Sequence, residues 1–328
     1  MRVRRIYPAA LVAAVAIAGT FVAKAYEWPA RPVTIIVPFG AGGPTDAVAR
    51  IVAEGMRGPL GQPVVIENVA GASGTIGVGR VARAAPDGYT VSMGSFATNV
   101  LNGGIFTLQY DLINDFEPVA LIAGEAVTIV ARKTMLADDL KGLIAWLKAN
   151  PDKATQGTSG PSGVGTVGGT FFQMETGTRF RFVPYRAGLA GAMRDLVAGQ
   201  IDFMIDTAAN SLPQWRAGTI SAYAVASKKR LAAAPDIPTV DEAGLPSFYI
   251  SVWYALFSPR HTPGDVIGKL NRAATMALAD PNIQRRLVDS GYELFPPEQQ
   301  TPEALGAFHK AEIDKWWPII KAAHIKAD

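Results

Sequence analysis

The chain lacks cysteine and contains only three histidines. Without cysteine it has no disulfide framework, no thiol nucleophile and no cysteine-based zinc or iron–sulfur site. His261, His309 and His324 stand apart from any Cys, Asp or Glu pattern with metal-ligand spacing, so we expect neither a metal ion nor another cofactor. His309 and His324 fall on the last helical segment and His261 lies in a proline-flanked loop. All three are expected at solvated surface positions.

Long apolar runs are missing beyond the first 25 residues. A membrane-spanning helix needs about 20 apolar residues. The start of the chain differs from such a helix: MRVRR is followed by an apolar stretch from about Pro8 to Val22 and then by Ala23-Lys24-Ala25. This order is typical of a secretory signal peptide. We expect residues 1–25 to be removed by cleavage after Ala25, which leaves a soluble protein in the periplasm.

An excess of positive charge is also absent once that segment is removed. Four basic residues and no acidic residue leave with it, so the formal net charge changes from +3 to −1. A nucleic-acid-binding protein usually carries a basic patch, and the sequence therefore favours no nucleic-acid partner. The remaining 303 residues predict two domains at the usual length of about 150 residues each.

Hydrolase and nucleotide motifs are absent or weak. The chain has no G-x-S-x-G nucleophile elbow. Ser159 and Ser162 lie among glycines, and the few histidines offer no obvious base for either of them. The stretch GVGTVG at 163–168 matches a dinucleotide fingerprint, but no acidic residue lies nearer than Asp195 to the offset of about 20 residues at which a ribose contact is expected. We expect no nucleotide site there.

What the sequence does contain is a repeated unit of a short β-branched run, a turn rich in small residues, and a helix-like segment. This alternation predicts an α/β fold with largely parallel sheets. The expected strands are Val33–Val37, Val64–Glu67, Tyr89–Gly94, Ala154–Thr158, Phe180–Val183 and Ile201–Ile205.

The turns after these strands are expected to meet in one crevice, because ligands of open α/β sheets lie beyond the carboxyl ends of the strands. Three turns precede Phe116 and three follow Lys153, which places the crevice between two lobes. Segments 115–133 and 219–229 are expected to cross between the lobes. A strand is expected at 250–259, and helices from Pro263 to about Ala279 and from about Pro302. The last of these helices carries a core-facing stripe of Leu305, Phe308, Ile313, Trp316 and Ile320.

The first of these turns, in VPFGAGGPTDAVAR at 37–50, has the composition of an anion site. Its glycines leave backbone N–H groups uncovered, and the start of a helix favours negative charge. We expect Gly43 at the N-cap and Pro44 at the first helical position. Asp46 is interpreted as a stabiliser of its own helix, since a direct contact from it would repel an anion. Asn68 is expected to fix its own turn through backbone hydrogen bonds.

Several longer motifs resemble the periplasmic solute-binding proteins of tripartite tricarboxylate transporters, often called Bug receptors. WPARPVTIIVPFGAGGPTDAVAR, LGQPVVIENVAGASGTIGV, APDGYTV, YDLINDFEPVALIA, LVAGQIDFMID and IPTVDEAGLP stand in the order and spacing of that family. The similarity extends over nearly all of the mature chain.

The resemblance implies a two-lobed Venus-flytrap receptor that closes on a small organic acid and delivers it to the permease subunits of a membrane transporter. Residues 26–124 and 226–328 would form lobe 1, and residues 125–225 lobe 2. Carried onto this sequence, the ligand-binding residues are Phe39, Gly40, Ala41, Gly42, Gly43, Ala72, Ser95, Phe96, Ala97 and Thr98 in lobe 1, and Thr158, Ser159, Ser162, Gly163, Tyr185, Asp206, Thr207 and Ala208 in lobe 2.

The chain departs from the family pattern in three places that line or border the expected cleft. First, Phe96-Ala97-Thr98-Asn99 replaces a glycine followed by a Thr-His-like pair. Second, the segment between Tyr185 and Asp195 is one residue longer than in the family, and Gly191 replaces a common proline. Third, Gly169-Thr170 replaces a His-Leu pair. Phe96 has two interpretations, stacking on an aromatic acid or filling the core. Arg186 likewise either pairs with a second carboxylate or is exposed.

Two other functions stay open on the sequence alone. One is a periplasmic esterase acting through Ser159 or Ser162, which lacks an evident base. The other is a signalling role, in which the closed form reports the ligand to a sensor kinase. The sequence does not identify the carboxylate.

Overall fold

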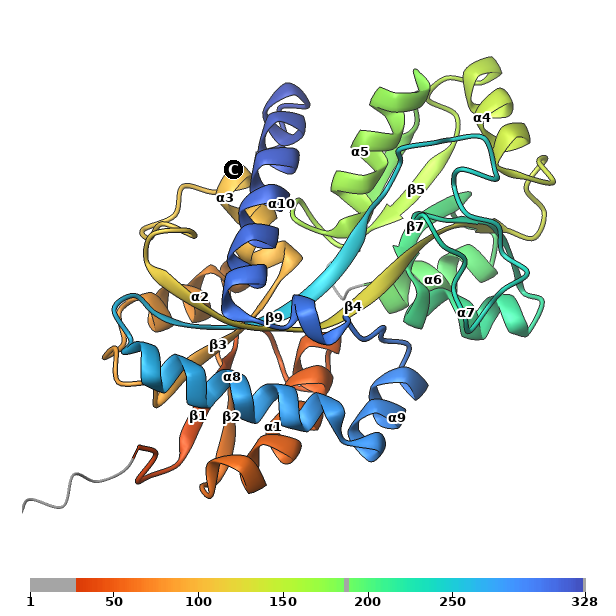
Figure 1. Cartoon of the computed structure of the whole chain (residues 1–328). Helices are drawn as coiled ribbons and strands as arrows, with labels where there is room; N and C mark the ends of the chain where they lie inside the picture. The colour runs from red at the N-terminus through yellow and green to blue at the C-terminus, as the bar shows by residue number, and fades with distance from the viewer. Residues whose placement is uncertain (1–27, 186–188, 327–328) are drawn as a thin grey trace, which may run out of the picture.

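The computed structural model describes residues 28–185 and 189–326. The expected signal peptide, its cleavage after Ala25, and Arg186 lie outside the described residues. Figure 1 shows two lobes joined by two long strands, β4 (Phe116–Arg132) and β9 (Ser251–Pro259). Among the described helices, none has the length and apolar character needed to cross a membrane.

The first lobe is built on a sheet with the order β2-β1-β3-β9-β4. β1 (Val33–Val37) is parallel to β2 (Val64–Asn68) and β3 (Thr90–Ser95), whereas β9 is antiparallel to both β3 and β4. The helices of this lobe are α1 (Pro44–Leu60), α2 (Thr75–Ala82), α3 (Asn102–Ile105), α8 (Gly264–Ala279), α9 (Pro281–Asp289) and α10 (Pro302–Ala322). Short turns η1 (Ala72–Gly74), η2 (Ala97–Leu101) and η3 (Pro297–Gln299) complete it.

The second lobe uses the other end of β4. Residues Val127–Ala131 pair antiparallel with β7 (Phe203–Thr207), which continues through β5 (Thr155–Thr158) to β6 (Arg181–Pro184) in parallel register. β8 (Ile220–Val225) also pairs with β4. The helices are α4 (Leu140–Ala149), α5 (Val164–Thr176), α6 (Leu189–Val197) and α7 (Ala208–Arg216).

The expectation of largely parallel sheets is correct for the strands that lead into the six turns and wrong for β4, β8 and β9, which pair antiparallel. The expected second crossing at 219–229 is also wrong. That segment forms β8 and stays beside β4 in the second lobe, and the chain returns to the first sheet through β9. Both runs are apolar and β-branched, so their composition does not distinguish them.

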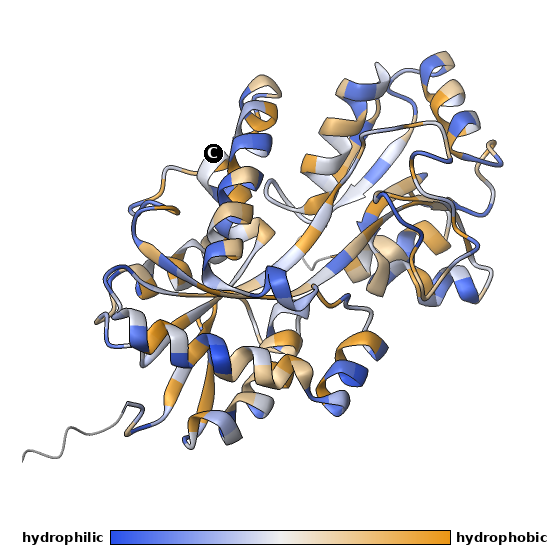
Figure 2. Ribbon diagram, in the orientation of Figure 1, coloured by the Kyte–Doolittle hydropathy of each residue, from blue (hydrophilic) through white to orange (hydrophobic). Residues whose placement is uncertain are grey.

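The two lobes share one main hydrophobic core. It includes Val78 and Leu101 in the first lobe, Phe172 and Phe203 in the second, and Trp316 on α10. In Figure 2, β1 and β2 are largely hydrophobic, while hydrophobic and hydrophilic residues alternate along α1, α8 and α10. This difference is expected for a largely buried strand such as β1 and for helices covered on one face.

The apolar stripe of the closing helix is confirmed, with Leu305, Ile313, Trp316 and Ile320 buried and Phe308 partly buried. The expected surface position of His309 is wrong. Its side chain is buried on the same face, and Nε2 lies 2.6 Å from the backbone oxygen of Asn99. Burial lowers the pKa of His309, so the neutral imidazole belongs to the core. His261 and His324 are exposed, as expected.

Candidate ligand-binding site

The opening turn between β1 and α1 has the expected geometry. Gly43 is the N-cap of α1 and makes no side-chain cap hydrogen bond, and Pro44 occupies the first helical position. Gly42 has a φ of 82°, which favours glycine. A Cβ built on Gly40 or Gly42 has no heavy atom within 4 Å, so this face of the turn is open.

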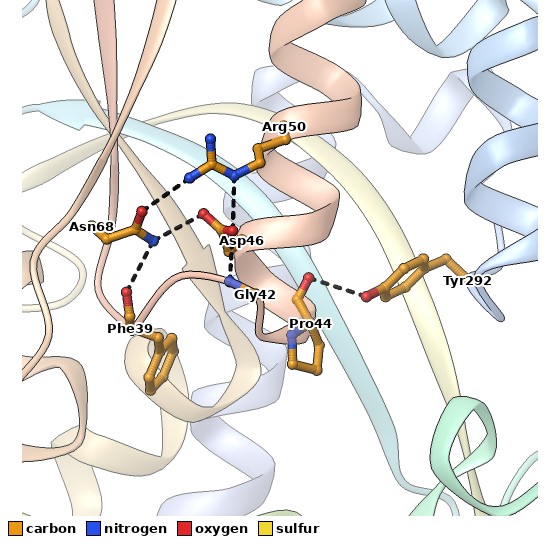
Figure 3. A network of polar contacts seen from close by, with 7 residues as sticks. All are labelled: Phe39, Gly42, Pro44, Asp46, Arg50, Asn68 and Tyr292. Carbon is orange, nitrogen blue, oxygen red and sulfur yellow. Dashed lines mark hydrogen bonds and ion pairs between the residues drawn. The ribbon is translucent and has the colours of Figure 1, made fainter.

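Asp46 holds the opening turn in place, as shown in Figure 3. Its carboxylate accepts hydrogen bonds from the Gly42 N–H at 2.8 Å, Arg50 Nε at 2.8 Å and Asn68 Nδ2 at 2.9 Å. Burial acts to raise the pKa of Asp46, but these hydrogen bonds outweigh it and lower the pKa to about 2. The interpretation of Asp46 as a structural residue is confirmed.

Asn68 also acts on the opening turn. Its Nδ2 donates to the backbone oxygen of Phe39 at 3.1 Å as well as to Asp46. Asn68 was expected to fix the turn that follows β2, and this expectation is wrong, because its amide fixes the turn that follows β1. β1 and β2 are neighbours, and their carboxyl ends meet. Residues 29 positions apart in the chain share this interaction.

Replacement of Asp46 by alanine is expected to lower the free energy of unfolding by about 1.5–3 kcal/mol, the usual range for a hydrogen bond to a charged group. The folded-state pKa is depressed, so the contribution of Asp46 is present above the ordinary pKa of 3.8 and is lost as the pH falls towards about 2. Urea unfolding of both proteins at pH 7 and near pH 3 measures this difference. A difference that grows on acidification would contradict it.

The second and third turns of the first lobe contact each other. Asn102 Nδ2 donates to the backbone oxygen of Ser73 at 2.9 Å. Ser95 and Thr98 place their hydroxyls 3.2 Å apart and are almost fully buried, so in this conformation they stabilise their own turn. Ala72, with a φ of 44°, is exposed, and Ala97 is partly exposed.

Phe96 is 2% exposed. Its ring packs edge to face against Trp316, with 5.3 Å between the centroids. In the described structure the ring therefore fills the core, which is the second of its two interpretations, and its face is not available for stacking on a ligand.

The turns of the second lobe also lie together. The Tyr185 N–H donates to the backbone oxygen of Thr158 at 2.7 Å, and Tyr185 Oη donates to Asp195 at 2.5 Å. Gly163 is the N-cap of α5 without a side-chain cap. Ser159 beside it is exposed, while Ser162 is buried.

Asp206 and Thr207 end β7 directly before α7. The Asp206 carboxylate is fully buried and accepts hydrogen bonds from the Thr207 N–H at 2.7 Å and from Asn210 Nδ2 at 2.5 Å. Thr207 is the N-cap of α7 and makes no side-chain cap hydrogen bond. Asp206 therefore orders the start of α7, and Ala208 is buried behind it.

The other two departures from the family pattern have packing roles. A Cβ on Gly169 would lie 2.0 Å from Gln156 Oε1 and 2.6 Å from the ring of Phe182, so α5 approaches its sheet closely at this point. A Cβ on Gly191 would lie 3.4 Å from the ring of Tyr185, an ordinary contact. Gly165 and Gly168 in the GVGTVG stretch likewise face Ile205, which gives that motif a role in helix packing.

Three contacts near the junction of the lobes involve residues that were not predicted from the sequence. Tyr292 Oη donates to the backbone oxygen of Pro44 at 3.0 Å (Figure 3). Tyr254 Oη donates to Glu125 Oε2 at 3.1 Å, and Gly291 lies against Ala209 of α7. The one feature of the sequence that could have indicated these contacts is Glu125, the single charged residue in the apolar run of residues 118–131.

Helix N-termini at three of the expected turns lack side-chain caps, whereas three other described helices have one. α1, α5 and α7 begin without one, whereas Asp139, Asp280 and Thr301 cap α4, α9 and α10. α2, α3 and α8 also begin without a side-chain cap, so the missing cap alone does not distinguish the expected turns. Free N–H groups at a helix start are suited to bind an anion.

Two cavities of about 300 and 390 Å³ lie beside α8 in the first lobe. None of the predicted site residues lines either of them. The predicted turns therefore form a separate region, defined by their hydrogen bonds and by the open faces of Gly40 and Gly42.

Residues 48–325 match the family model described as tripartite tricarboxylate transporter family receptor. A protein of Agrobacterium vitis from the TAR-I ttuE-ttuC' intergenic region is 40% identical over 304 residues, which cover 92% of this chain and 88% of that protein. BugT of Bordetella pertussis is 32% identical over 321 residues, which cover 95% and 97%.

Solved structures show the same similarity. MatC from Rhodopseudomonas palustris with bound malate is 38% identical with a TM-score of 0.79, over 89% of this chain and 99% of that one. A second R. palustris protein, Rpa4515 with adipate, is 32% identical with a TM-score of 0.80, over 92% and 100%.

Proposed function

This chain belongs to the tripartite tricarboxylate transporter receptor family, and from that premise we propose that it captures a small carboxylate between its two lobes and delivers it to the permease subunits of a membrane transporter. The resemblance to Bug receptors is confirmed. The ligand leaves the protein chemically unchanged, since the role of a solute-binding receptor is capture and release.

The uncapped starts of α1, α5 and α7 carry the proposal for the binding residues. One carboxylate is bound at the open face formed by Gly40, Ala41 and Gly42. It accepts from N–H groups of the opening turn other than that of Gly42, which donates to Asp46. A second polar end of the ligand is bound by the turn at Ser159–Gly163 and by the start of α7 at Thr207. Hydrogen bonds to a charged group contribute about 1.5–3 kcal/mol each, so a few of them reach micromolar affinity, about 8 kcal/mol.

The ligand class that we propose is an aliphatic dicarboxylate. Malate and adipate, found with two of the similar structures, are both of this kind. The burial of the Phe96 ring supports an aliphatic over an aromatic acid, because this ring packs on Trp316 and has no face free for stacking on a ligand.

The division of the lobes that we propose differs from the expected one at its second boundary. The Ala226 N–H donates to Val127 O and the Ile250 N–H donates to Ala226 O. The Phe248 ring packs against Phe171 and Phe172 of α5. We therefore place residues 125–250 in the second lobe, and residues up to 124 and from 251 onwards in the first.

A thermal-shift screen of the protein without residues 1–25 tests the function. At a hundredfold excess over Kd, a ligand adds about 2.7 kcal/mol of stability. We expect a shift with malate, adipate or related di-acids, and a smaller or no shift with benzoate-type acids. Recovery of the unchanged acid by mass spectrometry separates binding from hydrolysis. The absence of a shift with every mono-, di- and tricarboxylate would overturn the proposal.

Export is part of the same proposal. We infer that the mature protein begins at Tyr26 in the periplasm, on the basis of the sequence pattern that ends at Ala25. Intact-mass measurement of the protein from a periplasmic extract tests the cleavage position.

A further inference from the structure

Glu125 is a buried acidic residue at the point where β4 passes from one sheet to the other. Only 1% of its surface is exposed. Glu125 pairs with Val252 of β9 in the first sheet, and two residues later Val127 pairs with Thr207 of β7 in the second. An ionised carboxylate in such a position is costly unless donors or cations compensate for the loss of water.

Two tyrosines connect Glu125 with the opening turn. Tyr254 Oη donates to Glu125 Oε2 at 3.1 Å. The rings of Tyr254 and Tyr292 pack edge to face with 5.7 Å between centroids, and Tyr292 Oη donates to the backbone oxygen of Pro44. Glu125 is thereby linked to the first turn of α1.

On its other side Glu125 faces the start of α7. The Thr207 hydroxyl and the Ala209 N–H interact with the carboxyl group and act against the effect of burial on its pKa. Glu125 therefore lies between α1 and α7, two of the helix starts that we propose bind the ligand.

The titratable groups around Glu125 add negative charge and no positive charge. Burial raises the pKa of Glu125 to about 7, and burial together with the charge of Glu125 raises that of Asp206 to about 7. Burial also raises the pKa of Tyr254, Tyr292 and Glu293, the last of which pairs with β4 through its backbone. No lysine, arginine or histidine of the described residues contributes to the shift of Glu125 or Asp206.

Glu125 and Asp206 differ in their donors. Asp206 accepts well-aligned hydrogen bonds from the Thr207 N–H and from Asn210. The one well-aligned hydrogen bond to Glu125 comes from Tyr254, in addition to its interactions with Thr207 and Ala209. Hydrogen bonds to the charged form favour that form. By these aligned hydrogen bonds, the charge of Glu125 is compensated less than that of Asp206.

We propose that Glu125 is a proton-binding residue of the hinge, which is protonated when a carboxylate ligand occupies the neighbouring helix starts. This inference rests on the proposed function. A bound anion repels an ionised Glu125, and the repulsion is removed when a proton from solvent binds to the Glu125 carboxylate. The proton returns to solvent when the ligand leaves. Capture of an anion is thereby coupled to uptake of up to one proton.

The coupling has a defined sign. Because both carboxyl groups titrate near pH 7, the free protein is largely protonated at Glu125 at pH 6 and largely ionised at pH 8.5. The ligand binds the protonated form more tightly, so its affinity falls as the pH rises through about 7. With a further rise in the pKa of about one unit on binding, Kd increases about sevenfold over this range.

Isothermal titration calorimetry with malate and adipate tests the coupling, at pH 6, 7 and 8.5 and in two buffers of different ionisation enthalpy. We expect proton uptake and a Kd that rises about fivefold or more from pH 6 to 8.5. In Glu125→Gln the proton uptake and the pH dependence are expected to disappear. Glu312→Gln, which changes a partly buried carboxyl group on α10, is the matched control and is expected to keep both.

The ligand-free protein provides a second measurement. A raised folded-state pKa gives stability that is lost as the pH rises, so the Tm of the wild type should fall relative to that of Glu125→Gln between about pH 5 and pH 8. Binding without proton uptake, or an unchanged pH dependence in Glu125→Gln, would overturn the coupling and leave the receptor function intact. If neither acid nor any other carboxylate binds at any pH, the proposed function fails and the coupling fails with it.

Discussion

Gly42→Asp is expected to weaken the binding of a carboxylate ligand by about a hundredfold or more. Gly42 has a φ of 82° and an open face, with no heavy atom within 4 Å of an added Cβ. An aspartate there places a negative charge at the face proposed to bind the anion, and like charges in contact cost several kcal/mol. A hundredfold loss corresponds to about 2.7 kcal/mol. Calorimetric titration with the acid found in the thermal-shift screen measures it.

Gly61→Asp is the matched control for this variant. Gly61 follows α1 with a φ of 64°, and an added Cβ there also has no heavy atom within 4 Å. The substitution adds the same charge and a comparable backbone strain, about 1–2 kcal/mol, at the opposite end of the same helix. We expect its Kd to stay close to that of the wild type. Equal losses in both variants would show that strain or net charge, and not the position of Gly42, determines the effect.

The largest expected change in stability is that of Trp316→Ala. The Trp316 ring is 1% exposed and lies between Phe96 of the first lobe and Phe171 of the second, with centroid distances of 5.3 and 5.6 Å. Removal of a buried tryptophan side chain costs about 3–5 kcal/mol. Denaturant unfolding followed by circular dichroism measures the loss of free energy of unfolding.

Trp317→Ala provides the comparison one residue further along α10. Trp317 is 37% exposed and donates from Nε1 to the backbone oxygen of Val100 at 2.9 Å. Loss of one such hydrogen bond and part of a packing surface is expected to cost about 1–2 kcal/mol. If Trp317→Ala destabilises the protein as much as Trp316→Ala, the burial of Trp316 between the lobes does not explain its effect.

The features that the sequence predicts correctly are those in which neighbouring residues determine the structure. The opening turn is an example, because Gly43, Pro44 and Asp46 specify a helix start through positions within one turn. The six strands before the turns are also predicted to within two residues at their starts. The family resemblance adds the two-lobed arrangement, which local patterns alone suggest less directly.

The errors concern residues whose environment is set by distant parts of the chain. His309 is polar and lies beside an apolar stripe, and its burial depends on Asn99, 210 residues away. Asn68 reaches the carbonyl of Phe39 because two parallel strands end side by side. β8 and β9 have similar composition, and only their pairing partners distinguish them.

Glu125 could be noticed in the sequence as a single acid in an apolar run, but its role could not be assigned. Its neighbours Tyr254 and Tyr292 lie 129 and more residues further along the chain. No spacing rule connects these positions. Their proximity results from the antiparallel pairing of β4 with β9.

β4 has a further consequence for how the protein folds. One end of this strand pairs with β9 in the first sheet and the other end pairs with β7 and β8 in the second. A fragment that contains only one lobe would leave half of β4 without partners and expose the side of the common core that includes Trp316. Although Figure 1 shows two lobes, we expect neither to fold as an independent unit, because both sheets need β4.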